Sequence, residues 1–235
     1  MPRATPAPKP DRKPTRKPDR KQKIVADFRR SEILAAATKV FGSKGFEATR
    51  MEDIAKAAKL AKGTLYLYFD SKDAIYQATV RQALAELAAL TEQEVQKEPT
   101  CAGKIAALIR VRVAFWDEQQ SLYRVILSLS HESHRKRSIA WQRETVFYLQ
   151  SIFVEGAKAG EIPEQDFLGA AWAMMDAIRG ASERRIYAEG RSTEEDTKFL
   201  IEFLLRGLQA KTPLPQQKAP AEAGAMRPPT ISTKR

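Results

Sequence analysis

A short polar segment in the first third of the chain has side chains suited to binding a polyanion. Lys62 and Thr64 present an ammonium and a hydroxyl group that can contact base edges or phosphate oxygens. Tyr66 and Tyr68 add phenolic hydroxyls for phosphate, and Gly63 lets a partner approach the backbone closely. These groups predict noncovalent recognition of nucleic acid.

The elements around this segment are expected to be two short helices joined by a tight turn. Apolar residues recur at intervals of three and four, which is typical of helices, and the first helix would bury Met51, Ile54, Ala55 and Ala58. Only Lys59 and Leu60 separate it from the second, Ala61 to Tyr66, whose apolar side continues through Leu65 and Phe69. This arrangement predicts a helix-turn-helix with its second helix in the major groove, although plain core packing can produce the same spacing.

A preceding helix is expected to bury one face formed by Ile33, Leu34, Ala37 and Phe41. It should end at Gly45, where glycine can adopt the left-handed conformation, with Phe46 folding back onto Phe41. The next helix is expected to begin with a capping box, in which the Thr49 hydroxyl accepts from the Glu52 amide and Glu52 reaches back.

The net charge of +11 also indicates a polyanionic partner, but the excess lies at the ends of the chain. Residues 1–30 hold eleven basic and three acidic residues, and residues 211–235 hold five and one, so residues 31–210 carry a net −1. Both ends are rich in proline, and residues 1–22 are expected to form an extended basic arm that cannot hold a helix. Such an arm can bind phosphates without sequence preference or simply aid solubility. Residues 211–235 are expected to be a disordered tail.

Composition excludes several other classes of protein. Cys101 is the single cysteine, which excludes an internal disulfide and a four-cysteine zinc site. No apolar run reaches the length of a membrane span, and the start of the chain lacks an apolar signal segment. We therefore expect a cytoplasmic protein, associated with the nucleoid, that has no membrane partner.

Beyond residue 72 the pattern predicts further helices. Ser71 can cap a long helix through Leu90, and helical periodicity returns over residues 104–119, 121–132, 138–158, 165–188 and 194–209. The last begins with a capping box formed by Ser192 and Glu195, and its apolar stripe holds Phe199, Leu200, Phe203, Leu204 and Leu208. Such a stripe can pair with a second copy or be buried within one subunit.

The sequence also resembles a known family. The segment from Arg30 to about Ala78 resembles the DNA-binding domain of the tetracycline-repressor (TetR) family in these residues: Ile33-Leu34-x-x-Ala37, Phe41-x-x-x-Gly45-Phe46, Thr49, Ile54-Ala55 and Lys62-Gly63-Thr64-Leu65-Tyr66-x-Tyr68-Phe69-x-x-Lys72-Asp73. The resemblance implies an all-α homodimer. It would have a three-helix DNA-binding domain (residues 23–72) and a helical-bundle domain for ligand binding and dimerisation (residues 73–210), paired through the last two helices.

The resemblance also implies the DNA-binding residues. Phosphate contacts are implied for Thr49, Tyr66, Tyr68 and Lys72, and base or groove contacts for Lys62, Gly63 and Thr64; Arg50 and Lys59 are neighbouring cations that we add. The chain departs from the family pattern at four positions, with Lys59 for a turn glycine, Ala61 for a capping serine, Leu67 for a tyrosine and Tyr68 for a histidine. If Lys59 keeps a left-handed turn, it does so at a free-energy cost of about 1 kcal/mol.

A ligand pocket is expected among the middle helices, where large apolar side chains suit a hydrophobic or aromatic molecule. The candidates are Phe115, Trp116, Tyr123, Trp141, Tyr148, Trp172 and Met175, with Arg112 and Arg179 to orient an acidic ligand. For each aromatic residue an ordinary core position is the alternative, and for each arginine a surface or interface ion pair. His131, Glu132 and His134 are too few to predict a metal, and no cofactor is expected.

These features together predict a homodimeric repressor that binds an inverted repeat in double-stranded DNA and is released by a small hydrophobic or aromatic molecule. An architectural, nucleoid-associated protein without a ligand is the alternative. A helical enzyme finds no support, because the sequence shows no nucleophile with a base, paired carboxylates or Gly-rich phosphate loop.

Overall fold

The computed structural model describes residues 20–128, 132–188 and 191–209, and every regular element in these ranges is an α-helix. The helices are α1 (Arg20–Lys44), α2 (Met51–Ala57), α3 (Lys62–Tyr66), α4 (Lys72–Val95), α5 (Cys101–Glu118), α6 (Gln120–Ser128), α7 (Glu132–Lys158), α8 (Phe167–Tyr187) and α9 (Thr193–Gly207). The predicted all-α fold class is confirmed. None of the described helices is long and apolar enough to cross a membrane.

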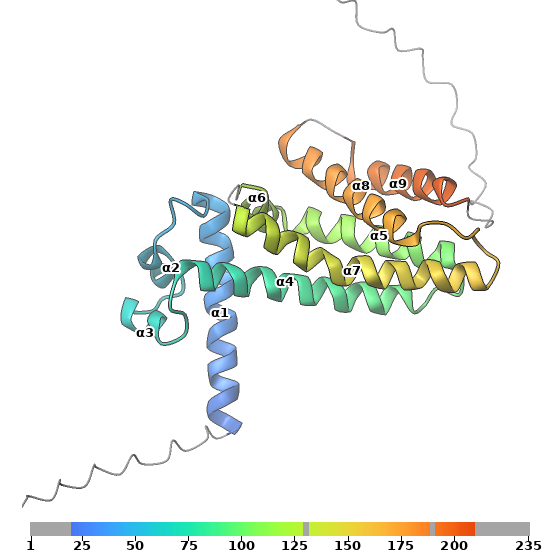
Figure 1. Ribbon diagram of the computed structural model, residues 1–235. Helices are drawn as coiled ribbons and strands as arrows, with labels where there is room; N and C mark the ends of the chain where they lie inside the picture. The colour runs from blue at the N-terminus through green and yellow to red at the C-terminus, as the bar shows by residue number, and fades with distance from the viewer. Residues whose placement is uncertain (1–19, 129–131, 189–190, 210–235) are drawn as a thin grey trace, which may run out of the picture.

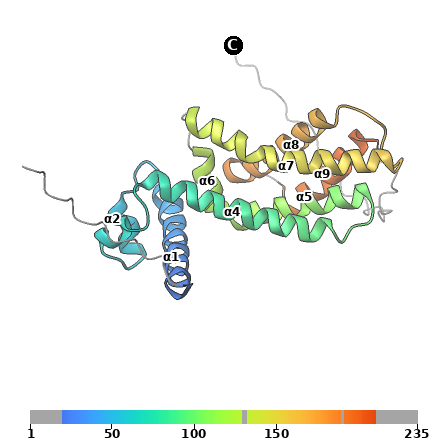
Figure 2. The ribbon, with the colours of Figure 1, turned by 60° about the horizontal axis from the view of Figure 1, so that its bottom comes forward.

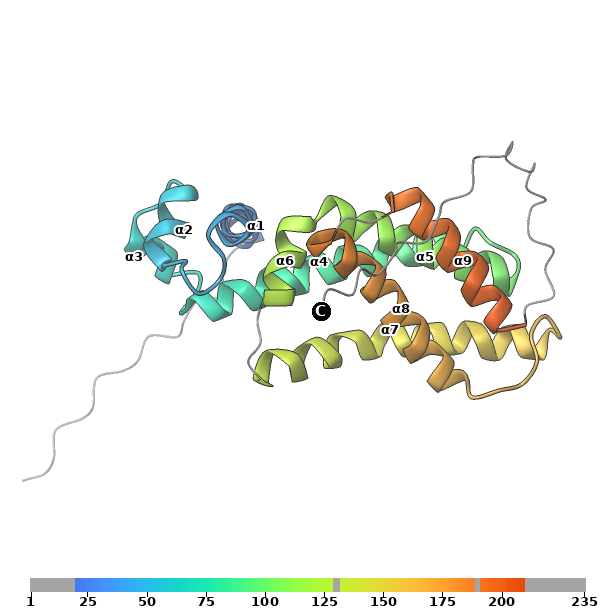
Figure 3. The same ribbon diagram turned by 90° about the horizontal axis from the view of Figure 1, so that it is seen from above.

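Helices α2 and α3 lie at one end of the molecule, and α5, α7, α8 and α9 gather at the other (Figures 1 and 3). Helix α1 crosses the first part of α4, which then runs from this end into the larger bundle (Figures 1 and 2). The Ser71 hydroxyl caps α4, as predicted, by accepting from the Ala74 amide at 3.1 Å. Helix α4 therefore joins the two ends of the molecule mechanically.

Helix α1 ends as the sequence predicts. Gly45 follows it with a φ of +78°, and the Phe46 ring folds back to 5.6 Å from the Phe41 ring. Both rings contact Tyr76 of α4 edge-on, at centroid distances of 5.3 and 6.3 Å. An aromatic cluster thus fixes the end of α1 against α4.

The start of α1 differs from the expectation. Residues 20–22 belong to this helix, so the prediction that the nonhelical arm extends to residue 22 was wrong. The last proline of the arm is Pro18, and a helix that begins two residues beyond it keeps all its backbone donors. The rest of the predicted arm and the predicted tail at 211–235 lie outside the described residues.

The predicted capping box before α2 was also wrong. The N-cap is Arg50, whose amide donates to the Asp53 carboxylate at 2.9 Å. Thr49 is buried, and its hydroxyl donates to the Gly45 carbonyl at 2.6 Å, so the side chain closes the preceding loop and does not cap the helix. Asp53 also pairs with Lys44 at 2.6 Å, and this hydrogen bond lowers the pKa of the Asp53 carboxyl.

Several helix boundaries in the bundle differ from those that the apolar periodicity predicts. Helix α5 begins at Cys101, three residues early, because the Thr100 hydroxyl caps it by accepting from the Gly103 amide at 3.1 Å. Helix α7 begins at Glu132, before the expected residue 138, and α6 ends at Ser128, before residue 132. The Ser192–Glu195 capping box of α9 is confirmed.

Two apolar clusters stabilise the fold. The first joins α1, α2 and α3 to the first half of α4 and to α6, and it includes Leu65, Ile75 and Leu122. The second fills the bundle of α5, α7, α8 and α9 around Leu108, Leu149 and Phe153. Because the first cluster crosses the expected domain boundary at residue 72, the first half of α4 packs with α1, α2 and α3.

Candidate functional site

Helices α2 and α3 form the turn that the sequence predicts. The Leu60 amide donates to the Ala55 carbonyl at 2.8 Å, and Lys59 has a φ of +56°. Ala61 occupies the N-cap of α3 without a side-chain cap. The left-handed turn at Lys59, which the sequence suggested conditionally, is therefore present.

We expect Lys59→Gly to raise the free energy of unfolding by about 1 kcal/mol, because an L side chain is strained in the left-handed region and glycine is not. Urea denaturation measures the change. Lys59→Ala is the matched control, since it removes the same ammonium but keeps a Cβ at positive φ. A midpoint for Lys59→Gly at or below that of Lys59→Ala would show that the turn stores no strain.

The outer face of α3 presents the residues predicted to read DNA. Lys62 is exposed and forms an ion pair with Glu52 of α2, and this hydrogen bond raises the pKa of the Lys62 ammonium. A Cβ placed on Gly63 would meet nothing within 4 Å, so packing within the chain does not require glycine there. Tyr66 is 43% exposed, whereas Thr64 is half-buried.

Two of the other predicted DNA-contacting side chains, Thr49 and Lys72, form contacts within the chain instead. The Thr49 hydroxyl is buried and bound to Gly45, so the structure contradicts a direct phosphate contact from this side chain. The Lys72 ammonium donates to the carbonyls of Phe46 and Glu47, at 2.6 and 3.2 Å, and lies over the Phe46 ring. Tyr68 is half-buried, while Arg50 and Lys59 are exposed.

Arg30 is a residue that the sequence argument missed. Its guanidinium donates to the Tyr68 carbonyl at 2.8 Å and lies 4.3 Å from the Phe69 ring centroid. It thereby holds the segment after α3 against α1. No local pattern identifies this contact, since the acceptor is a backbone carbonyl 38 residues away.

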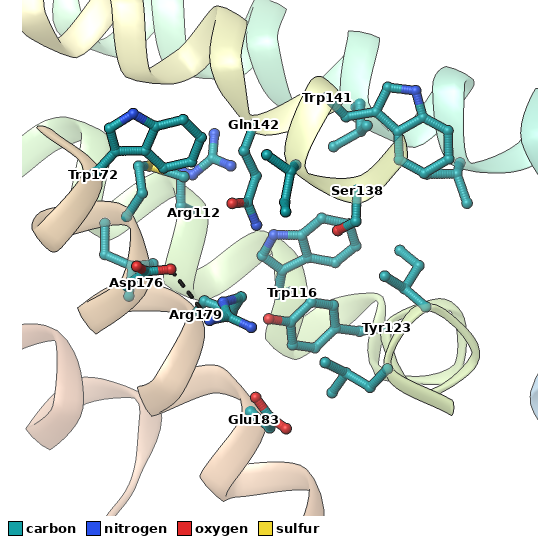
Figure 4. Close-up of a pocket in the computed structure, with 17 residues that line it drawn as sticks. Arg112, Trp116, Tyr123, Ser138, Trp141, Gln142, Trp172, Asp176, Arg179 and Glu183 are labelled. Atoms are coloured by element: carbon teal, nitrogen blue, oxygen red, sulfur yellow. Dashed lines mark hydrogen bonds and ion pairs between the residues drawn. The ribbon is translucent and has the colours of Figure 1, made fainter. Parts of the chain in front are cut away.

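A cavity of about 740 Å³ lies between α4, α5, α6, α7 and α8 (Figure 4). All three tryptophans of the chain, Trp116, Trp141 and Trp172, line it, with Met175 and Tyr123. Trp116 stacks on Tyr123 at 4.7 Å, and burial raises the pKa of the Tyr123 hydroxyl to about 12. Most of the aromatic candidates thus lie around one apolar space.

A second cavity of about 590 Å³ lies between α4, α5 and α7, and Tyr148 lines it. Burial raises the pKa of the Tyr148 hydroxyl, as does its hydrogen bond to Glu92. Leu84, Arg112 and Trp141 line both cavities. Phe115 lines neither of them, because its ring is buried edge-on against Trp116 in the first apolar cluster.

The two candidate arginines differ in environment. Arg179 lines the first cavity but is half-exposed and pairs with Asp176 at 3.2 Å. Arg112 is only 6% exposed, so the alternative of a surface ion pair is wrong for this residue. Burial lowers the pKa of the Arg112 guanidinium to about 10, which still leaves it charged at neutral pH.

A polar contact links α7 to the start of α4. Arg137 donates to the Asp73 carboxylate at 3.3 Å, and the neighbouring residues Ser138 and Ile139 line the first cavity. Asp73 is adjacent to Lys72, which binds the loop after α1. The α7 segment that lines the cavity is therefore in direct contact with the first turn of α4. Of the weak metal candidates, His131 and the side chains of Glu132 and His134 lie outside the described part of the chain.

The apolar stripe on α9 is divided between two environments. Leu200 and Leu208 are buried within the subunit, and Leu204 packs partly against the same cluster. Phe199 and Phe203 are 43% and 59% exposed, and their rings stack on each other at 5.6 Å. Only these two aromatic side chains of the stripe face outward.

Comparison with known proteins places these features in a family. Residues 33–79 match the model of the bacterial regulatory proteins of the tetR family. The chain is 31% identical over 156 residues to the HTH-type transcriptional regulator BetI of Rhizobium meliloti, covering 64% of this chain and 75% of that protein. It is 26% identical over 136 residues to the fatty acid metabolism regulator protein of Bacillus subtilis, covering 57% and 70%.

The fold is also similar to that of FadR from Bacillus subtilis, solved in complex with stearoyl-CoA. The TM-score is 0.69 at 23% identity, covering 75% of this chain and 98% of that one. The helix-turn-helix, the match to the family model and the match to most of BetI all indicate the same family. The chain belongs to the TetR family of bacterial transcriptional regulators.

Proposed function

We propose that the protein is a homodimeric repressor that binds an inverted-repeat operator and is released by a small hydrophobic or aromatic ligand. The observation that carries this proposal is the cavity of about 740 Å³ whose wall includes α4, because the first half of α4 packs with α1, α2 and α3. The similarity to transcriptional regulators also favours a binding role over catalysis.

The surface of α3 supports major-groove binding. Glycine in a helix costs about 1 kcal/mol relative to alanine, yet no described residue comes within 4 Å of a Cβ placed on Gly63. Close approach of DNA to this backbone would explain the glycine, because a side chain there would obstruct the contact. Lys62 would exchange Glu52 for base edges or phosphate, while Tyr66, Arg50 and Lys59 are exposed for phosphate contacts.

The exposed phenylalanines support pairing through α8 and α9. Phe199 and Phe203 lie on α9, and Leu168 and Tyr187 of α8 are also exposed, at 39% and 60%. A two-fold axis beside these helices would bury the same exposed apolar side chains on both subunits. The dimer would then present two α3 helices to major-groove faces about 34 Å apart.

The cavity supports a small-molecule ligand, since its volume is within the range of about 300 to 1,000 Å³ that is usual for such sites, and its three tryptophans favour an apolar body. The names of two similar proteins, a fatty acid metabolism regulator and a FadR bound to stearoyl-CoA, support an elongated apolar molecule as one class of ligand. A ligand that displaces α7 would act on Asp73 through Arg137, and so on the first turn of α4.

Selection of bound duplexes from a random DNA pool tests the DNA-binding part of the proposal. We expect a recurring inverted repeat whose half-sites are one helical turn apart, or a multiple of it. An architectural protein would instead return no common sequence, and its binding would depend steeply on salt.

In the same selection, Lys62→Ala is expected to change the preferred bases, because Lys62 lies where α3 meets base edges. Tyr66→Phe removes one phenolic hydroxyl and is the control, since it should weaken binding about equally for all sequences. If Lys62→Ala recovers the same ranking of sites as the wild type, base recognition belongs to other residues.

A further inference from the structure

Arg112 is a buried cation that lacks a matching anion among the residues that the structure describes. The residue is 6% exposed, and the only hydrogen bond found for its guanidinium among the described residues is from Nη1 to the Thr145 hydroxyl at 3.4 Å. Its Nε atom is buried without any acceptor. No described carboxylate forms an ion pair with it, so both its charge and a donor are left uncompensated.

A buried cation without an anionic partner destabilises the folded protein. Removing a guanidinium from water without an ionic partner is strongly unfavourable, and a buried charge in a folded protein is normally paired. A methionine or leucine would fill the same position more favourably. The position of Arg112 therefore indicates a partner that is present only in the bound state.

The surroundings of Arg112 are those of a binding site. Its side chain lies between Trp172 and Gln142 in the cavity wall (Figure 4), and it also lines the second cavity with Leu84 and Trp141. The guanidinium thus lies where the two apolar spaces meet. Two acidic groups of the cavity walls are engaged elsewhere, since Asp176 pairs with Arg179 and Glu92 binds Tyr148. Glu183 and Glu144 also line the cavities, but neither forms an ion pair with Arg112.

We propose that Arg112 binds the carboxylate of the ligand, which makes the effector of the proposed regulator an amphipathic organic acid with its anionic group buried between the two cavities. The apolar body of the acid would lie against the tryptophans of the first cavity. This inference rests on the proposed function and adds the chemical class of the ligand. A guanidinium recognises a carboxylate through two parallel N–H donors. Because Arg112 is buried, the anion that pairs with it must be small enough to fit inside the protein.

Two kinds of acid share this chemistry, fatty acids and aromatic acids, and the experiment separates them. Isothermal titration calorimetry of the full-length protein compares dodecanoate with dodecanamide, and 2-naphthoate with 2-naphthamide. The three tryptophans give a parallel fluorescence signal for the dodecanoyl compounds. At least one acid is expected to bind about 10- to 100-fold more tightly than its amide, because only the acid compensates the buried charge.

Arg112→Met should abolish this preference and leave the melting midpoint of the free protein unchanged or higher, because the unpaired charge is removed. Arg179→Met is the control, since Arg179 lines the same cavity but is already paired and half-exposed, and it should keep the preference. A lower midpoint for Arg112→Met would assign Arg112 a structural role and overturn the proposal.

Other outcomes overturn it as well: an amide that binds as tightly as its acid, no binding by either acid, or dodecanoyl-CoA that binds more tightly than dodecanoate and is unaffected by Arg112→Met. Release of the selected DNA, measured in the same samples, separates this inference from the proposed function. An amide that releases DNA as well as its acid leaves ligand-dependent release intact and removes only the role of Arg112. An acid that binds through Arg112 without releasing DNA keeps the role of Arg112 and removes ligand-dependent release.

Discussion

Asp196→Asn is expected to lower the free energy of unfolding by about 3 kcal/mol, because it removes the buried carboxylate that pairs most closely with a buried arginine. Asp196 lies in the first turn of α9 and its side chain is 2% exposed. It accepts from Nη1 of Arg185 of α8 at 3.1 Å, and Arg185 is 8% exposed. The same guanidinium reaches the Val113 carbonyl and Asp117 of α5, so three helices meet at one ion-pair network.

Urea denaturation monitored by circular dichroism measures this loss. Glu194→Gln is the matched control, because Glu194 lies in the same first turn but is exposed, and its loss should cost less than about 1 kcal/mol through the helix dipole. The double variant Asp196→Leu with Arg185→Met should recover most of the stability, since both charges are then absent. Equal effects of Asp196→Asn and Glu194→Gln would show that the network contributes little.

Phe203→Glu is expected to weaken dimerisation about 1,000-fold, because about 2 kcal/mol is lost at each of two symmetry-related positions. Phe203 is 59% exposed and stacks on Phe199, so the folded subunit does not depend on its burial. Sedimentation equilibrium gives the dimer dissociation constant. Binding to the selected inverted repeat should fall with it, since a monomer reads one half-site.

Phe28→Glu is the control for the dimer measurement. Phe28 is 63% exposed, so the same apolar side chain is replaced at similar exposure, but it lies on α1 at the opposite end of the molecule from α9 (Figure 1). It should leave the dissociation constant unchanged. If Phe203→Glu leaves it unchanged too, the subunits pair through another surface.

Much of the fold and part of the candidate site could be predicted from the sequence, because their causes are local. Helical spacing predicts the helices, glycine at position 45 predicts the end of α1, and the turn between α2 and α3 follows from the two residues that separate them. Ser71 and Ser192 cap the helices that they were expected to cap. Each of these features depends on residues within about one helical turn of one another.

The wrong predictions concern residues whose local pattern allowed more than one contact partner. Thr49 and Glu52 have the spacing of a capping box, but Thr49 binds the carbonyl of Gly45 and Glu52 pairs with Lys62 of the next helix. Phe115 and Trp116 are adjacent aromatic residues on α5, and only Trp116 lines the cavity. The side of a helix that faces a cavity depends on which other helices pack against it, and sequence spacing does not give that arrangement.

The sequence by itself determined the helical fold class, the turn before α3 and the family resemblance. Tertiary structure alone decided that Arg112 is buried between two cavities without a paired anion among the described residues, and that Arg185 and Asp196 form a buried pair. The physical reason is that secondary structure depends on neighbours along the chain, whereas the environment of a charge depends on residues brought together from distant helices. The sequence does not distinguish an arginine that is solvated from one that is paired within the chain or one that binds a ligand.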